Sequence, residues 1–240
     1  MKINNKLSLT IAIPAYNEED NIEWVLNNTL KNLPRYTQDY EVVLVNDGSK
    51  DRTGEIAEKI AAKNSCLRVI HQQNGGYSKA MLTGINASRK KYVAYMPADG
   101  QFLVDDMRHC FEVMPRNDMV LGYRGGRQDY TIRRIIFSYT YLLILLLLFN
   151  IKYMDVGWVV IWNTKKVRSL KLNATKGIFI LAETVVRFMK SGHKIAEAPS
   201  YYRPRHAGEA KNARFKVALD TFLNAFKLWL ELGILKKDLK

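Results

Sequence analysis

The stretch YVAYMPADGQ, residues 92–101, joins a short apolar run to a carboxylate and an amide. Residues 92–96 predict a buried β-strand, because a continuous apolar run of this length ends at turn-forming residues. Asp99 and Gln101 follow, two residues apart, so their side-chain oxygens could face a common point. Oxygen ligands of this kind suit a hard divalent cation, which also takes ligands from substrate phosphates. Taken alone, the stretch leaves a plain turn open, because Pro, Asp and Gly are common turn residues.

The chain before this stretch alternates strand patterns with helix patterns. Strands are predicted at residues 7–13, 40–45 and 67–70, and helices at residues 18–33, around 56–60 and at 79–89. This alternation predicts βαβ units, and hence an α/β fold with a mostly parallel sheet flanked by helices. We expect Ser49 or Asp51 to cap the second helix.

Polar motifs follow three of the predicted strands. Pro14-Ala15-Tyr16 follows the first strand, Asn46-Asp47 the second and Asp99-Gly100-Gln101 the fourth. In parallel sheets, ligands bind beyond the carboxyl ends of the strands. We therefore expect the three motifs to line one crevice.

Beyond about residue 120 the pattern becomes less regular. We expect a basic, glycine-rich loop at residues 122–127, a strand at 156–162, a helix at 178–189, a strand at 195–198 and a basic loop at 201–211.

Two segments suggest contact with a membrane. Residues 135–151 contain no charged side chain, but they fall short of the roughly 20 apolar residues of a typical membrane span. We therefore favour a buried or interfacial helix there, while a span of minimal length stays open. A second apolar stripe predicts an amphipathic helix that either lies at the lipid surface or packs on the core. This stripe consists of Phe215, Leu219, Phe222, Phe226 and Trp229.

The formal net charge of +14 indicates a polyanionic partner, such as nucleic acid, anionic lipid headgroups or a nucleotide diphosphate. No motif supports nucleic-acid binding. No Gly-x-Gly-x-x-Gly sequence follows the first strand, which disfavours a dinucleotide oxidoreductase.

Cys66 and Cys110 lack the spacing of a metal site, and residues 1–6 lack the apolar core of a signal peptide. Both features favour a reducing, cytosolic setting.

Five motifs, in this order and spacing, resemble those of the family 2 glycosyltransferases with the GT-A fold. They are residues 13–19 (IPAYNEE), 45–51 (VNDGSKD), 74–80 (NGGYSKA), 98–101 (ADGQ) and 203–211 (RPRHAGEAK). The likeness is strongest to the branch of dolichol-phosphate mannose synthase and the bacterial polyprenyl-phosphate hexosyltransferases. It implies a GT-A domain over residues 1–212, with a nucleotide-sugar half at 1–120 and an acceptor half at 121–212. A C-terminal amphipathic, interfacial helix would follow at residues 213–240.

The resemblance implies roles for individual residues of this chain. Nucleotide-sugar binding is implied for Pro14, Ala15, Tyr16, Asn17, Glu18, Asp47, Gly76, Ser78, Ala98 and Asp99. Binding of the acceptor and its phosphate is implied for Arg124, Arg134, Ser138, Arg203, Arg205 and Lys211. The catalytic residues implied are Asp99, Gln101, Arg124 and Arg134, and the implied metal ligands are Asp99 and Gln101.

The chemistry of these residues fits those roles. Tyr16 can stack on a base, and an ionised Asp47 can only accept hydrogen bonds from the base or ribose. The planar fork of arginine suits phosphate, and Ser138 lies one helical turn after Arg134. Plainer explanations also stay open: Asp47 as a turn residue, Glu18 as a helix-start residue, and any one arginine as part of a solvated surface.

Two positions depart from the family pattern. Pro97 stands where an aspartate usually precedes the metal-binding Asp99, and Asn46 also replaces an aspartate. Asp99 and Gln101 could still hold Mg²⁺ or Mn²⁺ together with the phosphates of the donor, because magnesium needs only one or two carboxylates. We expect weak metal binding without the donor. A changed donor preference or reduced activity stays open.

The implied reaction is the inverting transfer of a hexose from a GDP- or UDP-sugar to a polyprenyl or dolichyl phosphate. It would take place at the cytoplasmic side of a membrane, with the protein peripheral or interfacially anchored. A lipid phosphate is already anionic, so it can attack without a strong base, while a metal ion stabilises the leaving diphosphate. Glu183 resembles a family glutamate near the acceptor, although a position on the helix surface explains it equally well. A membrane-protein partner or a homo-oligomer stays open.

Two alternatives remain from the sequence. A saccharide acceptor would need a carboxylate base within reach of its hydroxyl, and Asp105 and Asp106 are available for that role. A non-catalytic accessory protein is the other alternative, and Pro97 is the feature that favours it.

Overall fold

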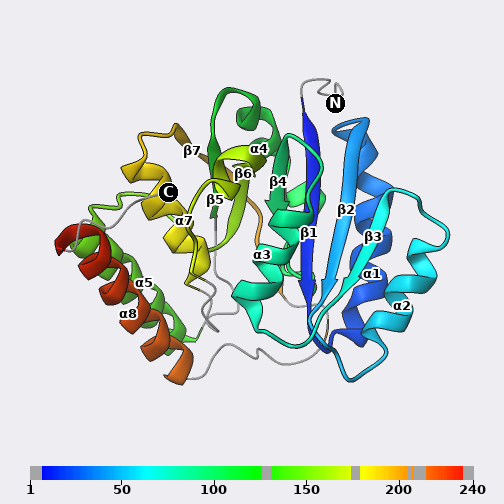
Figure 1. Cartoon of the computed structure of the whole chain (residues 1–240), viewed down its shortest axis with the longest axis horizontal. Coiled ribbons are helices and arrows are strands. Elements are labelled where there is room, and N and C mark those ends of the chain that lie inside the picture. The colour runs from blue at the N-terminus through cyan, green and yellow to red at the C-terminus, as the bar shows by residue number, and fades with distance from the viewer. Residues whose placement is uncertain (1–6, 126–130, 174–178, 205–206, 208–214, 235–240) are drawn as a thin grey trace.

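The computed structural model describes residues 7–125, 131–173, 179–204, 207 and 215–234. Its centre is a seven-stranded sheet with the strand order β3-β2-β1-β4-β6-β5-β7 (Figure 1). The strands are β1 (Ser8–Ala15), β2 (Asp39–Asn46), β3 (Leu67–His71), β4 (Tyr92–Tyr95), β5 (Met119–Arg124), β6 (Val159–Asn163) and β7 (Ile195–Ser200). Strand β6 is antiparallel to both of its neighbours, and the other pairings are parallel. The predicted α/β fold with a mostly parallel sheet is confirmed.

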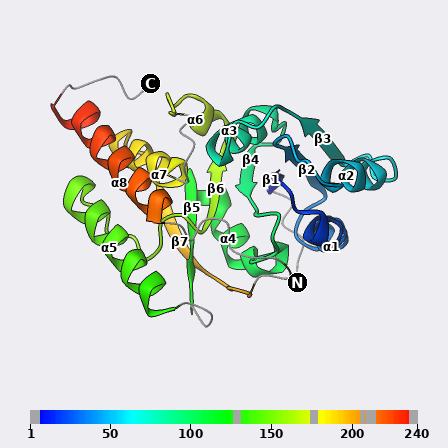
Figure 2. The ribbon, with the colours of Figure 1, turned by 90° about the horizontal axis from the view of Figure 1, so that it is seen from below.

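Helices cover the sheet on both faces and at one end. The helices are α1 (Glu19–Asn32), α2 (Thr53–Ala61), α3 (Tyr77–Ala87), α4 (Arg108–Val113), α5 (Ile132–Phe149), α6 (Thr164–Arg168), α7 (Ile180–Lys190) and α8 (Phe215–Trp229). Figure 2 shows α3 and α6 on one face of the sheet and α1 and α4 on the other. It also shows α5 and α8 side by side near the end that holds β5 and β7.

The two-sided cover explains the uninterrupted apolar sequence of the central strands. Val43 and Val45 of β2 pack with Ala80 of α3 on one face of the sheet. Val42 and Leu44, which point the other way, belong to the main core. Because successive residues of a strand face opposite sides, all four positions must be apolar when both sides are covered. Each such side chain contributes about 1.5–3 kcal/mol when fully buried.

The second half of the chain corrects two sequence expectations. Residues 122–124, expected in a loop, belong to β5. This strand is short, and Gly122 obscures its pattern in the sequence. Glycine is needed at this position because a Cβ there would lie 2.6 Å from the Cβ of Val159 on the neighbouring strand. The apolar helix α5 begins at Ile132, before the apolar run, and ends at Phe149.

The strand directions bring one end of most strands to a common edge, the lower edge in Figure 1. The carboxyl ends of β1, β2 and β4 lie there because these strands are parallel. Strand β6 runs the opposite way, so its amino end is at the same edge, and β5 and β7 again end there. We call this the functional edge.

Helices α5 and α8 leave many apolar side chains exposed. Among the side chains of α8 that the structure describes, Thr221, Ala225 and Leu228 are buried, whereas Phe222 and Phe226 of the predicted stripe are exposed. The side chains of Phe215 and Leu219 lie outside the described residues. The exposed apolar residues of α5 are Ile132, Ile136, Phe137, Tyr139, Leu143, Leu146 and Leu147. Within the described ranges, no helix is both long and apolar enough to cross a membrane.

Candidate functional site

The loop after β1 and the loop after β2 are tied together at the functional edge. The backbone N–H of Asn17 donates to Ser49 Oγ (3.0 Å), and Asn17 Oδ1 accepts from the N–H of Lys50 (2.8 Å). The N–H of Glu18 donates to Thr53 Oγ1 (2.8 Å). These bonds hold Asn17 in a left-handed conformation, with φ of 52°. The sequence motifs at 13–19 and 45–51 therefore meet, as expected.

The residues predicted to hold the nucleotide sugar lie along this edge. Tyr16 is 36% exposed. Ala15, Ser78 and Ala98 are buried beside it or beneath the adjoining loops, and Pro14 is half-buried.

Asp47 fixes the loop that precedes α3. Its Oδ1 accepts from Gln72 Nε2 (2.7 Å) and from the N–H of Gly75 (2.9 Å), and its Oδ2 accepts from the N–H of Gly76 (2.9 Å). The side chain is buried, at 3% exposure. Both carboxylate oxygens thus already accept hydrogen bonds from the segment that precedes α3.

Asn46 has a network of its own. Its Oδ1 accepts from the N–H of Ser49 (3.0 Å), which orients the amide so that Nδ2 faces His71 Nδ1 at 3.0 Å. The other ring nitrogen of His71 lies 2.9 Å from Glu58 Oε1. Asn46 therefore acts as a structural link between β2, β3 and α2 in this chain.

The metal motif forms a tight turn after β4. Asp99 Oδ1 accepts from the N–H of Gln101 (3.1 Å), and Gln101 Nε2 lies 3.4 Å from the hydroxyl of Tyr202. Gly100 has φ of +72°, and a Cβ there would lie 2.4 Å from the Trp24 ring. Glycine is therefore required at this position.

The donor set at this turn fits a metal that shares its ligands with a substrate. It offers the carboxylate of Asp99 and the amide of Gln101, and no group of three His, Cys, Asp or Glu side chains occurs among the residues that the structure describes. Mg²⁺ commonly keeps waters and binds through one or two carboxylates plus substrate phosphates. These residues suit that mode rather than a cage formed by the protein alone.

A row of aromatic rings runs beneath the metal motif. Tyr77 contacts Tyr95, Tyr95 contacts Phe102, Phe102 contacts Trp158, and Trp158 contacts Tyr202, with ring centroids 4.7–5.8 Å apart. Burial, followed by the neighbouring Tyr95, raises the pKa of the Tyr77 hydroxyl well above its usual value. The row connects the start of α3 with the segment that follows β7.

The arginines predicted to bind phosphate are held by carboxylates. Arg124 makes a bidentate pair with Asp155, and Arg203 makes one with Asp106 through Nε–Oδ2 (2.6 Å) and Nη2–Oδ1 (2.8 Å). The Arg203 side chain is still 49% exposed at the functional edge. Ser138 lies in α5, and the backbone of Arg134 lies in the first turn of that helix. The side chain of Arg134, and Arg205 and Lys211 as a whole, lie outside the described residues.

Neither carboxylate suggested as a base for a saccharide acceptor is placed for that role. Asp106 is buried at 3% exposure, where it holds Arg203 and accepts from the N–H of Leu103. Asp105 accepts from the Tyr36 hydroxyl (2.7 Å) and pairs with Arg35. The geometry thus weighs against the saccharide alternative as the sequence framed it.

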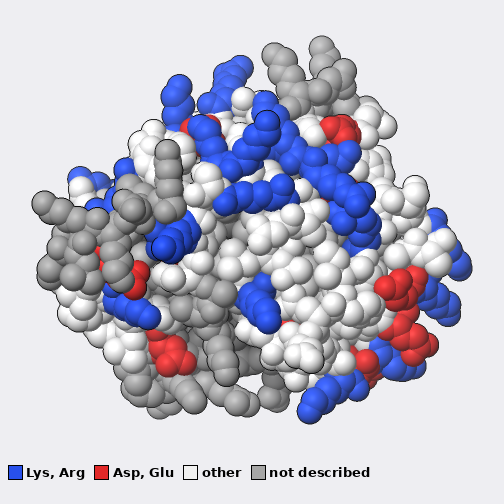
Figure 3. Space-filling model, viewed as in Figure 1, with Lys and Arg blue, Asp and Glu red and all other residues white. Residues whose placement is uncertain are grey.

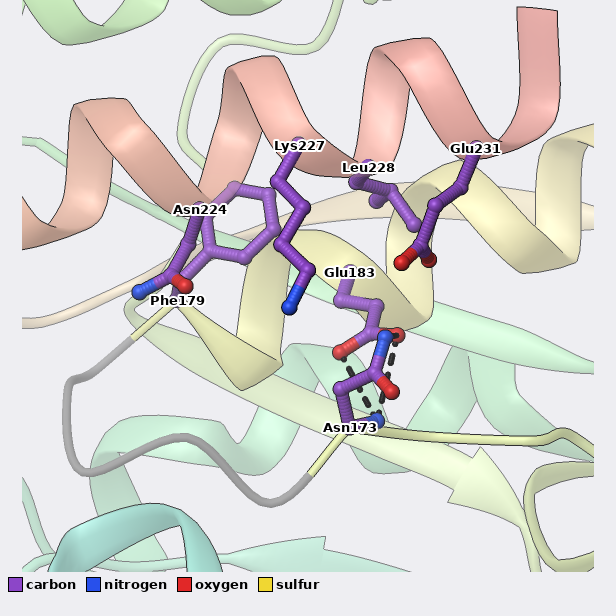
Figure 4. Close-up of a pocket in the computed structure, with 7 residues that line it drawn as sticks. All are labelled: Asn173, Phe179, Glu183, Asn224, Lys227, Leu228 and Glu231. Carbon is purple, nitrogen blue, oxygen red and sulfur yellow. Dashed lines mark hydrogen bonds between the residues drawn. The ribbon is translucent and has the colours of Figure 1, made fainter. Parts of the chain in front are cut away.

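Glu183 is buried rather than on the helix surface. It accepts from Arg187 Nε (2.9 Å) and from the backbone and side chain of Asn173. Burial raises the pKa of its carboxyl, against the lowering effect of Arg187. Figure 4 shows Lys227 and Leu228 of α8, and Glu231 of the π-helical turn that follows it (Leu230–Ile234), turned toward it. The surrounding cavity of about 250 Å³ is lined by Asn173, Phe179, Glu183, Asn224, Lys227, Leu228 and Glu231.

Asp155 and Trp158 were missed in the sequence, and Asp106 was named there only as a possible base for a saccharide acceptor. Asp155, Asp106 and Trp158 meet the predicted residues only because distant strands end at one edge. The apolar and aromatic run at 156–162 was a signal for Trp158, but it indicated only a strand. For the two aspartates the sequence carries no local signal, because their arginine partners lie 31 and 97 positions away.

Comparison with known proteins bears on the family and the fold. The sequence model described as "Glycosyl transferase family 2" matches residues 10–164. The "Uncharacterized glycosyltransferase EpsJ" of Bacillus subtilis is 44% identical over 91 residues, which are 38% of this chain and 26% of that protein. The "Undecaprenyl-phosphate 4-deoxy-4-formamido-L-arabinose transferase" of Pseudomonas fluorescens is 33% identical over 129 residues, 52% of this chain and 38% of that protein.

A longer match is the "Dodecaprenyl-phosphate galacturonate synthase" of Rhizobium johnstonii, 27% identical over 222 residues, 89% of this chain and 65% of that protein. This chain therefore spans less than two thirds of the length of these three relatives.

Two solved structures share the fold. Glucosyl-3-phosphoglycerate synthase from Mycobacterium tuberculosis, solved with Mn²⁺, UDP and phosphoglyceric acid, has a TM-score of 0.66 at 16% identity, covering 93% of this chain and 78% of that one. The mannosyltransferase PcManGT from Pyrobaculum calidifontis, solved with GDP-Man and Mn²⁺, has a TM-score of 0.65 at 18% identity, covering 92% and 64%. The expected GT-A fold is confirmed, and the chain belongs to glycosyl transferase family 2.

Proposed function

We propose that this chain is an inverting glycosyltransferase that moves a hexose from a UDP- or GDP-sugar to a polyprenyl phosphate. The observation that carries the proposal is the meeting of a base-sized aromatic ring, a metal motif and two arginines at one edge of the sheet. These are Tyr16, the Asp99–Gln101 turn, Arg124 and Arg203. Relatives named for undecaprenyl and dodecaprenyl phosphate support this acceptor class.

The geometry fits chemistry without a protein base. A phosphate is anionic at neutral pH, so its oxygen can attack the anomeric carbon while the nucleoside diphosphate leaves from the other side. The chain then has to hold the two substrates in line and stabilise the leaving group. Tyr16 would stack on the base, and Arg203 and Arg124 would face phosphates. Asp99 and Gln101 would hold a Mg²⁺ or Mn²⁺ ion, which when bound acts as a Lewis acid on the diphosphate.

The position of the apolar surface supports an acceptor in the membrane. The exposed apolar side chains of α5 and α8 form neighbouring surfaces, and α5 starts shortly after Arg124. An amphipathic surface of this kind can lie among lipid headgroups, where a basic protein also gains from anionic lipid. We propose peripheral or interfacial attachment on the cytoplasmic side. A homo-oligomer or a membrane-protein partner remains compatible with this surface.

A transfer assay tests the proposed function. Radiolabelled UDP- and GDP-sugars are offered with polyprenyl phosphate in the presence of Mg²⁺, Mn²⁺ or EDTA. We expect product from one donor, lost in EDTA and lowered on the order of 100-fold in Asp99→Ala. Asp39→Ala, which removes a carboxylate at the opposite edge of the sheet, is the matched control and should keep full activity. Nucleotide binding without transfer from any donor would instead favour an accessory protein, the alternative that Pro97 supports.

A further inference from the structure

Asp106 lies in a 3₁₀ turn (Val104–Met107) that follows the metal motif along the chain. Its side chain is buried, at 4% exposure. The carboxylate accepts from the backbone N–H of Leu103, which lies 3.0 Å from Oδ2. It also accepts from Arg203, whose Nε lies 2.6 Å from Oδ2 and whose Nη2 lies 2.8 Å from Oδ1. One buried carboxylate therefore joins the segment after the metal motif to the segment after β7.

The backbone ties the same two segments together. The N–H of Arg203 donates to the carbonyl oxygen of Gln101 (2.9 Å), and the N–H of Tyr201 donates to the carbonyl oxygen of Asp106 (3.3 Å). Between them, the Tyr202 hydroxyl lies 3.4 Å from Gln101 Nε2. Because Gln101 belongs to the metal motif, Arg203 is fixed beside that motif through both its backbone and its side chain.

The pair with Asp106 sets the plane of the Arg203 guanidinium. Two parallel bonds to one carboxylate are more directional than a single contact. The pair uses Nε and Nη2, and Nη1 takes no part in it. Although its partner is buried, the Arg203 side chain is 49% exposed. A long side chain is thus ordered before a ligand arrives, which lowers the entropy lost on binding.

We propose that Asp106 is a positioning residue, which holds Arg203 beside the metal motif so that the guanidinium and the metal ion contact the same donor diphosphate. The inference rests on the proposed transferase function, because it takes the Asp99–Gln101 turn as the position of the metal. A metal ion with so few protein ligands takes others from substrate phosphates, which favours the diphosphate over the lipid phosphate as the group that Arg203 contacts. Asp106 itself touches no substrate and acts through Arg203.

The test measures the affinity for UDP and GDP by titration calorimetry with Mg²⁺ in the wild type, Asp106→Asn, Arg203→Gln and the double variant. Asn keeps one oxygen acceptor but cannot hold both N–H groups, so the guanidinium gains freedom. We expect the diphosphate to bind about tenfold more weakly in Asp106→Asn and more weakly still in Arg203→Gln, because bonds to charged groups are lost. The double variant should match Arg203→Gln within about twofold, because a residue that acts through Arg203 adds nothing once Arg203 is gone. Losses that multiply in the double variant would overturn the proposal.

Ligands that lack the diphosphate separate positioning from damage to the site. Uridine, guanosine and a short-chain polyprenyl phosphate are titrated by NMR into the same four proteins, and we expect equal affinities in all four. A loss for the nucleoside as large as the loss for its diphosphate would mean that Asp106 only supports the fold of the site. A loss confined to the polyprenyl phosphate would place Arg203 at the acceptor. Either result would reject the inference.

Glu41→Gln provides the matched control for the loss of a buried carboxylate. Glu41 also grips an arginine, Arg68, by its Nε and Nη2, but it lies near the start of β2, away from the functional edge. We expect Glu41→Gln to lower the melting temperature without changing the affinity for UDP or GDP. Equal losses of affinity in Glu41→Gln and Asp106→Asn would contradict the proposal.

A measurement on the wild type decides the matter if Asp106→Asn does not fold. The Nε–H resonance of Arg203, assigned with Arg203→Gln, is followed by NMR while UDP or GDP is added with Mg²⁺. We expect the diphosphate to shift this resonance while the hydrogen stays protected from exchange, because the pair with Asp106 persists in the complex. An unshifted resonance, or a loss of protection on binding, would reject the inference.

These readouts do not depend on sugar transfer, so they separate the inference from the proposed function. The expected affinities without transfer from any donor would reject the proposed function and keep the inference. Transfer together with multiplied losses in the double variant would keep the proposed function and reject the inference. A wild type that binds neither UDP nor GDP would reject both.

Discussion

At the scale of single residues, Pro97 carries a prediction about the proposed metal site. It is buried next to Ala98 and Asp99, and it leaves the turn with one carboxylate. Pro97→Asp would add a second carboxylate close to the first. We expect Mn²⁺ binding without donor to tighten about tenfold or more, because each added charged ligand strengthens the site. We also expect the melting temperature to rise more with added Mn²⁺ than in the wild type, because a buried unpaired carboxylate costs stability until it is bound.

Titration calorimetry with Mn²⁺ and thermal unfolding with and without the ion measure both effects. Asn86→Asp adds the same charge at an exposed position near the end of α3, and it should change neither. Equal Mn²⁺ affinity in Pro97→Asp and the wild type would mean that Asp99 and Gln101 do not face a metal position.

The same scale shows what the sequence could predict about the site and what it could not. Asp47 and Asp99 could be predicted as site residues because each follows a strand within a local motif. The use that Asp47 makes of its oxygens was not found, because it depends on how the loop 74–76 folds back onto it. The pairing of Asp155 with Arg124 and of Asp106 with Arg203 was not predicted, because a local sequence pattern does not record which distant residues the fold brings together.

At the scale of elements, the sequence predicted strands and helices where the pattern was long or repeated. The central strands β1 and β2 carry continuous apolar runs, so they were predicted closely. Strand β5 was missed because its last residues are glycine, tyrosine and arginine, which also suit a basic loop. For α8, periodicity predicted an amphipathic helix, but the buried positions lie on another face from the stripe. Which face of a helix is covered depends on its partner, here α5.

The exposed surface of α5 carries a prediction about membranes. Leu147 is 73% exposed, so Leu147→Asp removes no buried contact and should leave the melting temperature unchanged. If α5 lies among lipid headgroups, the charge should weaken binding to anionic vesicles about tenfold, which corresponds to about 1.4 kcal/mol. Vesicle flotation measures this. Asn86→Asp, with the same change in charge at a polar position, should bind like the wild type. Equal binding by both variants would show that α5 does not touch the lipid.

At the scale of the whole molecule, charge is distributed unevenly. On the face of the molecule that Figure 3 shows, lysines and arginines gather over the upper part, whereas acidic side chains lie mainly toward the right-hand side. The upper part is the end at which β1 begins, opposite the functional edge (Figure 1). The net charge therefore favours contact with polyanionic surfaces in general, and the choice of substrate depends on the groups at the functional edge.

The strand order of the sheet also bears on whether residues 1–120 can fold as a separate half. Strand β6 lies between β4 and β5, and its Ile161 pairs with both Ala94 and Val120. Trp162 of β6 is fully buried and donates through Nε1 to Thr184 Oγ1 of α7 (3.1 Å). In a chain that ends before β6, the buried strand β4 becomes an edge strand with unpaired backbone groups. The row of aromatic rings also loses Trp158.

We therefore expect a chain that stops at residue 120 to lose its fold, although the nucleotide motifs at 13–19, 45–51 and 98–101 are all present in it. Dispersion of its ¹H–¹⁵N spectrum and its affinity for UDP and GDP measure this. A chain that stops at residue 212 is the matched comparison. It lacks α8 but keeps the whole sheet, so it should retain a dispersed spectrum and nucleotide binding at a lower melting temperature. A folded fragment of residues 1–120 that binds nucleotide as tightly as the full chain would show instead that the nucleotide half is independent, and that β6 completes only the acceptor side.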